Sequence, residues 1–576
     1  MSIFDIFRKK KIIDAPWSKY YAKEDLNYII PNISMYDQVL LSTRKYPNNV
    51  AIQYLGRKIK YKTFLKKIDI CAKGFNDLGI EKGDIVTILL PNVPECLICL
   101  YALNKLGAIA NMTHPLSAEE EIKQTLNETS SKYLIIYDAR YDKIKNFIKS
   151  TTVKKVIFVS PGDSLNIFKN IIFDISQIKK FEHHPIDRRF MEWSKFFRQS
   201  RFKKNFERKK FGKNTPAVIL HSGGTSGTPK NVVIQNRAFI FASKGEEIDL
   251  IRLTPGDSAL AIMPNFHGFG LSVLMHTPLS LGCSTILVPK FDAKKFDTLF
   301  KQTRPTCVLG VPTLFEALSN SNNEKDLDLS FLKYVISGGD ILPKNLEDKI
   351  NNYLSERGST ARITQGYGLS EALACVTMAH DHVNKPGSVG IPLAGNYIKI
   401  IDPNSRKKLR PNETGEIVIN SKALMMGYLN NEKETNEALQ IHDDGHIWLH
   451  TGDLGYLDED GFLFYKGRLK RMIITSGYNV YPSHIEEVIE GHPDVLQCTV
   501  VGIPHPYRGE VPKAFIVLKD SANKIFSKAH VRDYARKNLS KYMIPQEFVF
   551  RKSLPKTKLG KVDFQKLKSD IGEDDE

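Results

Sequence analysis

Short apolar segments alternate with longer segments of helical periodicity through most of the first 390 residues. The apolar segments are rich in β-branched residues and have the length of a buried strand: 84–90, 131–138, 154–160, 216–222, 284–290, 306–312 and 332–338. Such runs, separated by helix-length segments, are typical of parallel strands covered by helices. The pattern therefore predicts an α/β fold with parallel sheets.

The pattern changes between Gly390 and Tyr465, where four segments lie closer together and are joined by turn pairs: 396–402, 415–420, 446–451 and 461–467. This spacing predicts antiparallel hairpins that form a small β-barrel-like subdomain. After Lys470, about 105 residues of mixed strand and helix pattern have the size of a separate α+β domain. The predicted organisation is an N-terminal extension (1–34), a large domain (35–467), a small C-terminal domain (468–570) and an acidic tail (571–576).

Composition narrows the class of protein. With 42% hydrophobic and 25% charged residues among 576, the chain is an ordinary globular protein with room for a large core. Seven scattered cysteines favour a reducing compartment, and we expect a cytoplasmic protein. Cys96 and Cys99 form a C-x-x-C within an apolar stretch, which predicts a buried helix face rather than a redox or metal site. The first residues lack a secretory pattern, and no apolar run reaches 18 residues.

The net charge is +18, and half of this excess lies in a basic insert between Lys179 and Lys213. That insert has 13 basic residues against 4 acidic ones. A basic surface attracts nucleic acid, anionic lipid or anionic small molecules without choosing between them.

A Gly-, Ser- and Thr-rich loop follows the predicted strand 216–220. It consists of Ser222, Gly223, Gly224, Thr225, Ser226, Gly227, Thr228, Pro229 and Lys230. Its glycines let the backbone approach an anion, and its hydroxyls and lysine donate hydrogen bonds. A polyphosphate-binding loop is therefore favoured over a plain surface turn. It is not a Walker A loop, because Thr228 stands where that motif requires glycine and Pro229 precedes Lys230.

The loop resembles the signature of the AMP-forming adenylating enzymes, which include acyl-CoA synthetases, firefly-type luciferases and the adenylation domains of peptide synthetases. Further signatures follow in the superfamily's order over about residues 35–570, and the style is closest to fatty-acid CoA ligases. One departure is Asn231, where the family has glycine. The resemblance implies ATP, Mg²⁺ and coenzyme A as cofactors, and a C-terminal domain that moves.

Residues 365–371 are similar to the family's Y-G-x-T-E element. Tyr367 offers a flat ring for adenine, Ser370 a donor for phosphate, and Glu371 an oxygen ligand for Mg²⁺, with Thr225 as a second ligand. The remaining nucleotide-binding residues implied by the resemblance are Gly338, Gly339, Asp340, Gly366, Gly368, Asp453, Tyr465 and Arg468.

Two of these acids have alternative roles. Asp340 contacts the adenine amino group or caps the following helix. Asp453 accepts both ribose hydroxyls while Arg468 steadies ribose or phosphate, or else Asp453 is a plain turn residue.

The resemblance also assigns residues to the moving domain. Lys470 matches the hinge, and Lys561 matches the lysine that reaches the acyl carboxylate and the α-phosphate. Ser476 and Gly477 match a loop that leaves a narrow tunnel for the thiol. Rotation about Lys470 would withdraw Lys561 before the thiol attacks. The alternative for both lysines is an exposed, solvated side chain.

The acid-binding region is predicted from the segment 265–273. By the resemblance, His267 gates an acyl pocket formed by Phe269, Gly270, Val273 and Gly310, although a lone histidine beside a phenylalanine is also typical of a packed core. No charged residue there suits an amino group, so a medium- or long-chain fatty acid or an aromatic acid is favoured over an amino acid.

We therefore expect an ATP-dependent carboxylic acid–CoA ligase that acts through an acyl-AMP. One alternative is an enzyme that loads a carrier protein, and another is a non-catalytic membrane or nucleic-acid binder; nucleic acid is the less favoured partner. Residues 190–202 loosely resemble a helix in bacterial long-chain ligases, and with the basic insert they could lie on an anionic membrane surface. The insert could equally be a solvated charged segment, and the oligomeric state is left open.

Overall fold

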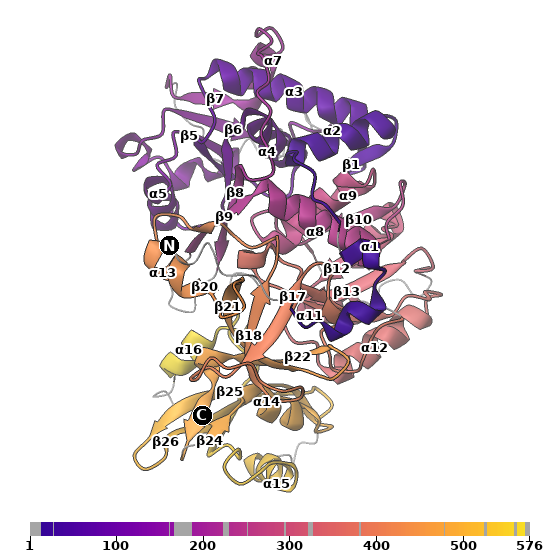
Figure 1. Ribbon diagram of the computed structural model, residues 1–576, viewed down its shortest axis with the longest axis vertical. Coiled ribbons are helices and arrows are strands. Elements are labelled where there is room, and N and C mark those ends of the chain that lie inside the picture. The colour runs from indigo at the N-terminus through magenta and orange to yellow at the C-terminus, as the bar shows by residue number, and fades with distance from the viewer. Residues whose placement is uncertain are drawn as a thin grey trace.

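The fold is known from a computed structural model (Figure 1). It describes residues 13–26, 28–160, 162–165, 187–222, 230–249, 252–292, 295–320, 327–379, 382–476, 478–522, 527–557 and 562–570. These residues form two large α/β sheets, a smaller antiparallel sheet and a C-terminal α+β domain, which lies at the bottom of Figure 1. The predicted fold class is confirmed.

The first large sheet has the strand order β19-β9-β8-β4-β3-β5-β6-β7. Its strands are β3 (Ile85–Leu89), β4 (Ile109–Met112), β5 (Tyr133–Tyr137), β6 (Lys155–Val159), β7 (Phe190–Glu192), β8 (Pro216–Ser222), β9 (Lys230–Gln235) and β19 (Gly427–Tyr428). Strands β8 to β7 are parallel, whereas β9 and β19 are added antiparallel at one edge. The helices associated with this sheet are α3 (Tyr61–Asp77), α4 (Pro94–Leu106), α5 (Glu119–Glu128) and α7 (Trp193–Ser200).

The second large sheet has the order β16-β15-β14-β13-β12-β10-β11-β1-β2. Its strands are β1 (Val50–Tyr54), β2 (Arg57–Lys60), β10 (Ser258–Ala261), β11 (Ser284–Leu287), β12 (Cys307–Gly310), β13 (Tyr334–Gly338), β14 (Ile363–Tyr367), β15 (Thr377–Met378) and β16 (Ile391–Pro392). The six strands from β1 to β14 are parallel, and the edges are antiparallel. Its helices are α2 (Met35–Lys45), α8 (Asn236–Asp249), the π-helix η5 (Phe269–His276), α9 (Thr277–Ser280), α10 (Phe296–Thr303), α11 (Pro312–Ser319) and α12 (Lys344–Ser355).

One apolar core joins the two large sheets, and α4 is buried within it along almost its whole length. Cys96 and Cys99 both lie in this core, where burial raises the pKa of their thiols. The prediction of a buried helix face is confirmed, and all seven cysteines are free thiols.

The antiparallel hairpins predicted after Gly390 are present. They contain β17 (Tyr397–Ile401), β18 (Gly415–Asn420), α13 (Glu432–Ala438), β20 (Leu439–Ile441), β21 (Ile447–Leu457) and β22 (Leu463–Arg468). Strand β21 pairs with β18, β20 and β22, so it is the centre of this sheet. The described part of the N-terminal extension, with η2 (Pro16–Tyr20) and α1 (Lys23–Leu26), lies against it, since Trp17 is buried and packs on Gly461.

The C-terminal domain follows the short 3-10 helix η8 (Leu469–Arg471). It contains β23 (Ile473–Thr475), β24 (Tyr478–Val480), α14 (Pro482–Glu490), β25 (Val495–His505), β26 (Gly509–Leu518), α15 (Lys528–Asn538), β27 (Glu547–Phe550) and α16 (Phe564–Ser569). Short 3-10 helices elsewhere are η3 (Asp138–Lys143), η4 (Ile148–Ser150) and η7 (Ser370–Ala372). Across the described residues, no helix has both the length and the apolar character needed to cross a membrane.

Candidate functional site

The carboxyl ends of the parallel strands carry most of the predicted nucleotide-binding residues. In open α/β sheets, ligands bind in the crevice outside these carboxyl ends. Strand β8 ends at Ser222, β12 at Gly310, β13 at Gly338 and β14 at Tyr367. The fold thus brings motifs that are far apart in the sequence to the carboxyl ends of strands in the two large sheets.

The two ends of the phosphate loop are held together, because Ser222 and Lys230 are paired across β8 and β9. The residues between them, including Gly223, Gly224, Thr225, Ser226, Gly227 and Thr228, lie outside the described residues. Lys230 itself has two partners: its Nζ is 2.7 Å from Oε2 of Glu434 and 4.7 Å from the centre of the Tyr428 ring.

Asn231, the departure from the family's glycine, has a structural role. Its side-chain amide donates a hydrogen bond to Oε2 of Glu128 on α5 at 2.8 Å, and the residue is buried. The side chain that replaces glycine therefore attaches the end of the phosphate loop to α5.

Three side chains from two strands, β14 and β22, meet around the carboxylate of Asp453. The hydroxyl of Tyr367 donates to Oδ2 at 2.7 Å, and Nε of Arg468 is 3.0 Å from Oδ1. The hydroxyl of Tyr465 is 3.5 Å from Oδ1, and the rings of Tyr367 and Tyr465 are 5.8 Å apart. Asp453 is buried within strand β21, so the alternative of a plain turn residue is wrong.

Burial and the nearby Asp453 carboxylate raise the pKa of Tyr367, which keeps its hydroxyl a hydrogen-bond donor. Burial likewise raises the pKa of Tyr465. A carboxylate with such neighbours can accept two hydroxyl groups of a sugar while the arginine balances its charge. The two aromatic rings beside it provide flat apolar surfaces.

Glu371 lies on η7, and its carboxylate accepts a hydrogen bond from the hydroxyl of Tyr428 at 3.1 Å. Among the described residues, no group of three or more His, Cys, Asp or Glu side chains could hold a metal by itself. A single carboxylate fits Mg²⁺, which is usually bound by one or two carboxylates together with the phosphates of the substrate. The predicted second ligand, Thr225, lies outside the described residues.

Two of the predicted glycines, Gly366 and Gly368, are closely packed against backbone atoms. A Cβ on Gly368 would lie 1.1 Å from the carbonyl oxygen of Ala374, and one on Gly366 would lie 3.0 Å from that of Thr377. A Cβ on Gly338 would be 3.6 Å from the ring of Phe269, so this glycine and this phenylalanine are brought together.

Asp340 follows Gly339, whose φ of +79° favours glycine. Its carboxylate accepts a hydrogen bond from the N–H of Ile341. The next helix, α12, begins after Pro343 and has no side-chain cap. The helix-capping alternative for Asp340 is therefore wrong.

The predicted acyl-pocket residues lie at η5 and at the end of β12. Nδ1 of His267 accepts a hydrogen bond from the N–H of Phe269 at 3.3 Å, and Val273 is buried. A Cβ on Gly270 would lie 2.1 Å from the carbonyl oxygen of Pro264, and one on Gly310 2.2 Å from Leu314. Close packing against the backbone explains the absence of a side chain at Gly270, and the assignment of these residues to an acyl pocket stays a prediction.

Lys470 lies between two arginines that contact different domains. Arg468 pairs with Asp453 in the large domain, whereas Arg471 is 2.6 Å from Glu486 on α14 of the small domain. Lys470 itself is exposed on η8. In the small domain, Ser476 is exposed at a φ of +51°. The predicted partners Gly477 and Lys561 lie outside the described residues.

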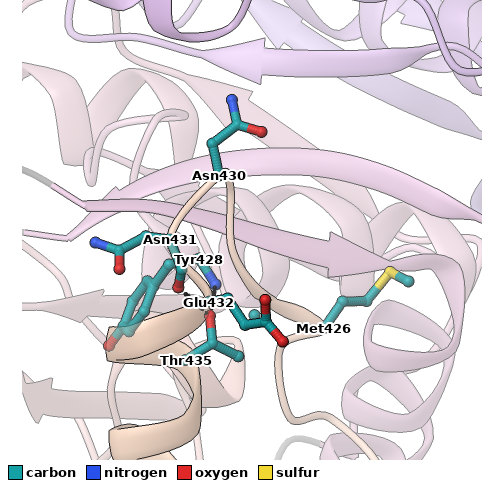
Figure 2. Close-up of a pocket in the computed structure, with 7 residues that line it drawn as sticks. Met426, Tyr428, Asn430, Asn431, Glu432 and Thr435 are labelled. Atoms are coloured by element: carbon teal, nitrogen blue, oxygen red, sulfur yellow. Dashed lines mark hydrogen bonds between the residues drawn. The ribbon is translucent and has the colours of Figure 1, made fainter.

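Sequence reasoning missed Tyr428 and Glu434, which contact the predicted residues Glu371 and Lys230. It also missed Glu416, whose carboxylate accepts from the N–H of Gly452, next to Asp453. Only the position of Glu416 in a predicted strand neighbouring Asp453 could have indicated it. A groove of about 420 Å³ lies beside Tyr428, and Figure 2 shows side chains that line it. Its lining includes Glu432 and no basic residue, so it does not suit a polyphosphate.

Comparison with known proteins identifies the family of this chain. Residues 41–429 match the AMP-binding enzyme family, and residues 484–561 match the AMP-binding enzyme C-terminal domain. A long-chain-fatty-acid–CoA ligase of Bacillus subtilis is 31% identical, over 95% of this chain and 96% of the relative. The 4-coumarate–CoA ligase 1 of Arabidopsis thaliana is 30% identical, over 85% of this chain and 84% of the relative.

Among solved structures, ATP-bound MatB from Rhodopseudomonas palustris has a TM-score of 0.81 at 24% identity, and the match covers 94% of this chain and 99% of that one. The fold and the family match define a nucleotide-binding α/β enzyme. The chain belongs to the AMP-binding enzyme family. It is an AMP-forming acid–thiol ligase that uses ATP, Mg²⁺ and coenzyme A, as the resemblance implied.

Proposed function

We propose that the acid is a medium- or long-chain fatty acid. The observation that supports this most is the position of Phe269. Its ring lies against Gly338, at the carboxyl end of strand β13. The residues that follow on η5, up to Met275, carry no charge, so an acid bound there would meet apolar side chains. The similarity to a long-chain ligase agrees with this, whereas the similarity to a coumarate ligase makes an aromatic acid the second candidate.

The chemistry has two steps. A carboxylate oxygen of the acid attacks the α-phosphorus of ATP, and the bond to pyrophosphate breaks, which leaves an acyl-AMP. The sulfur of coenzyme A then attacks the acyl carbonyl, the bond to AMP breaks, and the thiol proton is released. Several negative groups meet in the first step, so preorganised cations and donors are the main catalytic requirement.

We assign roles to residues accordingly. Asp453 accepts the ribose hydroxyls, Arg468 balances its charge, and Tyr367 stacks on adenine. Glu371 would hold Mg²⁺, which when bound neutralises phosphate charge. The ammonium group of Lys230 contacts the phosphates. His267 as a gate and Lys561 as the lysine that reaches the carboxylate remain predictions from the resemblance.

We also infer that residues 35–467 and 468–570 act as two domains that rotate about Lys470. The ion pairs of Arg468 and Arg471 support this boundary. Arg468 pairs with Asp453 on one side of Lys470, and Arg471 pairs with Glu486 in the small domain on the other side. Rotation at this point would move Lys561 away from the carbonyl before the thiol arrives.

The test of the proposed substrate is ATP–pyrophosphate exchange without coenzyme A, over a panel of acids from acetate to palmitate and including 4-coumarate. We expect exchange to be strongest with one range of fatty-acid lengths, from about C8 upward. Strongest exchange with 4-coumarate would contradict the fatty-acid proposal. Replacing coenzyme A by a phosphopantetheinylated carrier protein in the full reaction distinguishes a carrier-loading enzyme.

We further propose that the basic insert contacts an anionic membrane from the cytoplasmic side. Phe202 is 86% exposed and stands between Arg201 and Lys203, a pattern that suits a lipid headgroup region. Helix α7 does not supply the membrane face, because Trp193 and Phe196 are buried. The helical part of residues 190–202 therefore does not lie on the membrane with these aromatic residues, as its sequence suggested.

Vesicle sedimentation tests this contact. The full-length enzyme should bind vesicles of phosphatidylglycerol and phosphatidylcholine, bind phosphatidylcholine alone much less, and lose binding at about 0.5 M salt. The combined variant Phe202→Ser, Lys204→Glu, Lys209→Glu should not bind. Lys203 is left unchanged because it pairs with Asp77 at 2.7 Å. Unchanged binding by the variant would show that the insert is a solvated charged segment.

A further inference from the structure

The segment 425–429 connects two parts of the candidate site that are far apart in the sequence. The N–H of Met425 donates to the carbonyl oxygen of Glu371, and that of Leu429 donates to the carbonyl oxygen of Asn231, each at 2.8 Å. Between them, β19 pairs with β9, with Tyr428 opposite Val232. The segment therefore lies between the candidate Mg²⁺ ligand and the strand that begins at Lys230.

The segment is also fixed from its other side by α13. The N–H of Tyr428 donates to Oγ1 of Thr435 at 2.8 Å, and that hydroxyl donates to the carbonyl oxygen of Asn431. A Cβ on Gly427, whose φ is +149°, would lie 2.7 Å from Cγ2 of Thr435. Only glycine avoids this overlap, so the backbone of Tyr428 has a defined position.

The side chain of Tyr428 contacts two functional candidates with different parts of its structure. Its hydroxyl donates to Oε1 of Glu371 at 3.1 Å, and its ring face lies 4.7 Å from Nζ of Lys230. Figure 2 shows this side chain and that of Met426 pointing apart from each other. Burial and the Glu371 carboxylate raise the pKa of Tyr428, so its hydroxyl remains a donor.

Each contact leaves its partner able to bind a ligand. One hydrogen bond to Oε1 restricts rotation of the Glu371 carboxylate while lone pairs remain for a cation. A ring face attracts an ammonium group electrostatically and accepts no N–H hydrogen bond from it, so N–H groups of Lys230 remain for phosphate oxygens although the ammonium group also forms an ion pair with Glu434.

We propose that Tyr428 is a positioning residue that fixes both the carboxylate of Glu371 and the ammonium group of Lys230. This inference rests on the proposed roles of Glu371 in Mg²⁺ binding and of Lys230 in phosphate binding. The hydroxyl acts on the metal ligand, and the ring acts on the phosphate ligand. The two functions can therefore be separated by substitution.

The test uses the full-length enzyme and two variants. Tyr428→Phe removes the hydroxyl and keeps the ring, whereas Tyr428→Leu removes both. Mn²⁺ binding in the presence of α,β-methylene-ATP is measured by EPR, and binding of the nucleotide alone by calorimetry. We expect Tyr428→Phe to weaken Mn²⁺ binding about three- to tenfold with nucleotide affinity unchanged. Tyr428→Leu should weaken both, the nucleotide about three- to tenfold.

Controls separate this inference from the site assignment. Met426→Gln changes the side chain that points away from Tyr428 and should leave both affinities unchanged. Glu371→Gln should weaken Mn²⁺ binding, and in that background Tyr428→Phe should add nothing. Wild-type Mn²⁺ affinity in Tyr428→Phe, beside a weakened Glu371→Gln, would overturn this inference alone. Wild-type Mn²⁺ affinity in Glu371→Gln would overturn the role of Glu371 and this inference with it.

Discussion

Asp453 and Arg468 lie directly opposite each other on the antiparallel strands β21 and β22, with Nε of the arginine 3.0 Å from Oδ1 of the acid. The pairing register of the sheet therefore sets the distance between the two groups. Tyr367 reaches the same carboxylate from the end of β14 in another sheet. The cluster thus links the small antiparallel sheet to the carboxyl end of β14 in the second large sheet.

Substitution of Asp453 tests its assigned contact with ribose. Asp453→Asn keeps the shape but removes the charge that pairs with Arg468, so the KM for ATP should rise about 10- to 100-fold. The variant should also lose most of the preference for ATP over 3′-deoxy-ATP, measured by pyrophosphate exchange. The exposed Glu459, in the turn that connects the same two strands, provides the control Glu459→Gln. A variant that still discriminates against the deoxynucleotide would refute the contact.

Glu416 should support nucleotide binding indirectly. Its Oε1 accepts from the N–H of Gly452 at 3.1 Å, and its Oε2 is 3.0 Å from Nδ1 of His450, so it holds the residues that precede Asp453. We expect Glu416→Ala to raise the KM for ATP about three- to tenfold with the KM for the acid unchanged. Steady-state kinetics against each substrate checks this. Glu413→Ala, an exposed acid nearby, is the matched control, and equal changes in both KM values would contradict a role confined to the nucleotide.

A proline at Lys470 should separate the two half-reactions. Proline fixes φ at about −65°, which restricts rotation at the point between Arg468 and Arg471. Lys470→Pro should retain pyrophosphate exchange within about threefold and lose at least about tenfold in acyl-CoA formation. Lys470→Ala, which keeps backbone freedom, should retain both. Equal loss of both reactions in the proline variant would argue against a hinge at this residue.

A buried histidine should make stability depend on pH. Burial lowers the pKa of His276 to about 3, while Tyr101 and Gln38 hydrogen-bond its two ring nitrogens. In the unfolded chain the imidazole takes up a proton near pH 6.5, so its contribution is complete above that pH. The contribution falls as pH drops toward 3, by about 1.4 kcal/mol for each pH unit.

Denaturant unfolding between pH 7 and 4 measures this effect. His276→Gln is less stable overall but should have a shallower loss of stability with falling pH. The exposed His484 supplies the control His484→Gln, whose slope should equal that of the wild type. An unchanged slope in His276→Gln would mean that this imidazole takes up its proton at the same pH in the folded and unfolded protein, which would contradict the effect of burial.

The parallel strands could be predicted because their segments are apolar on both faces. Strands such as β5 are buried along nearly their whole length, as the continuous apolar run at 133–136 indicates. Strand β19 could not be predicted, because two residues have no periodicity and their partner β9 is almost 200 residues earlier. Tyr428 was missed for this reason.

The basic insert shows a second limit of predicting structure from the hydrophobic pattern of a sequence. The apolar face of α7 looks the same whether it meets lipid or protein. In the structure it packs on α3, where a Cβ on Gly74 would lie 2.7 Å from the ring of Phe196. The absent side chain of Gly74 makes room for that ring, a complementarity between distant segments that a single sequence does not reveal.

The identity of the products tests the central claim most directly. Purified enzyme with ATP, Mg²⁺, coenzyme A and palmitate is analysed by mass spectrometry for thioester and nucleotide. The account predicts palmitoyl-CoA and AMP in equal amounts, with pyrophosphate and without ADP. Formation of ADP, or AMP release without any thioester across the full range of fatty acids, would contradict it.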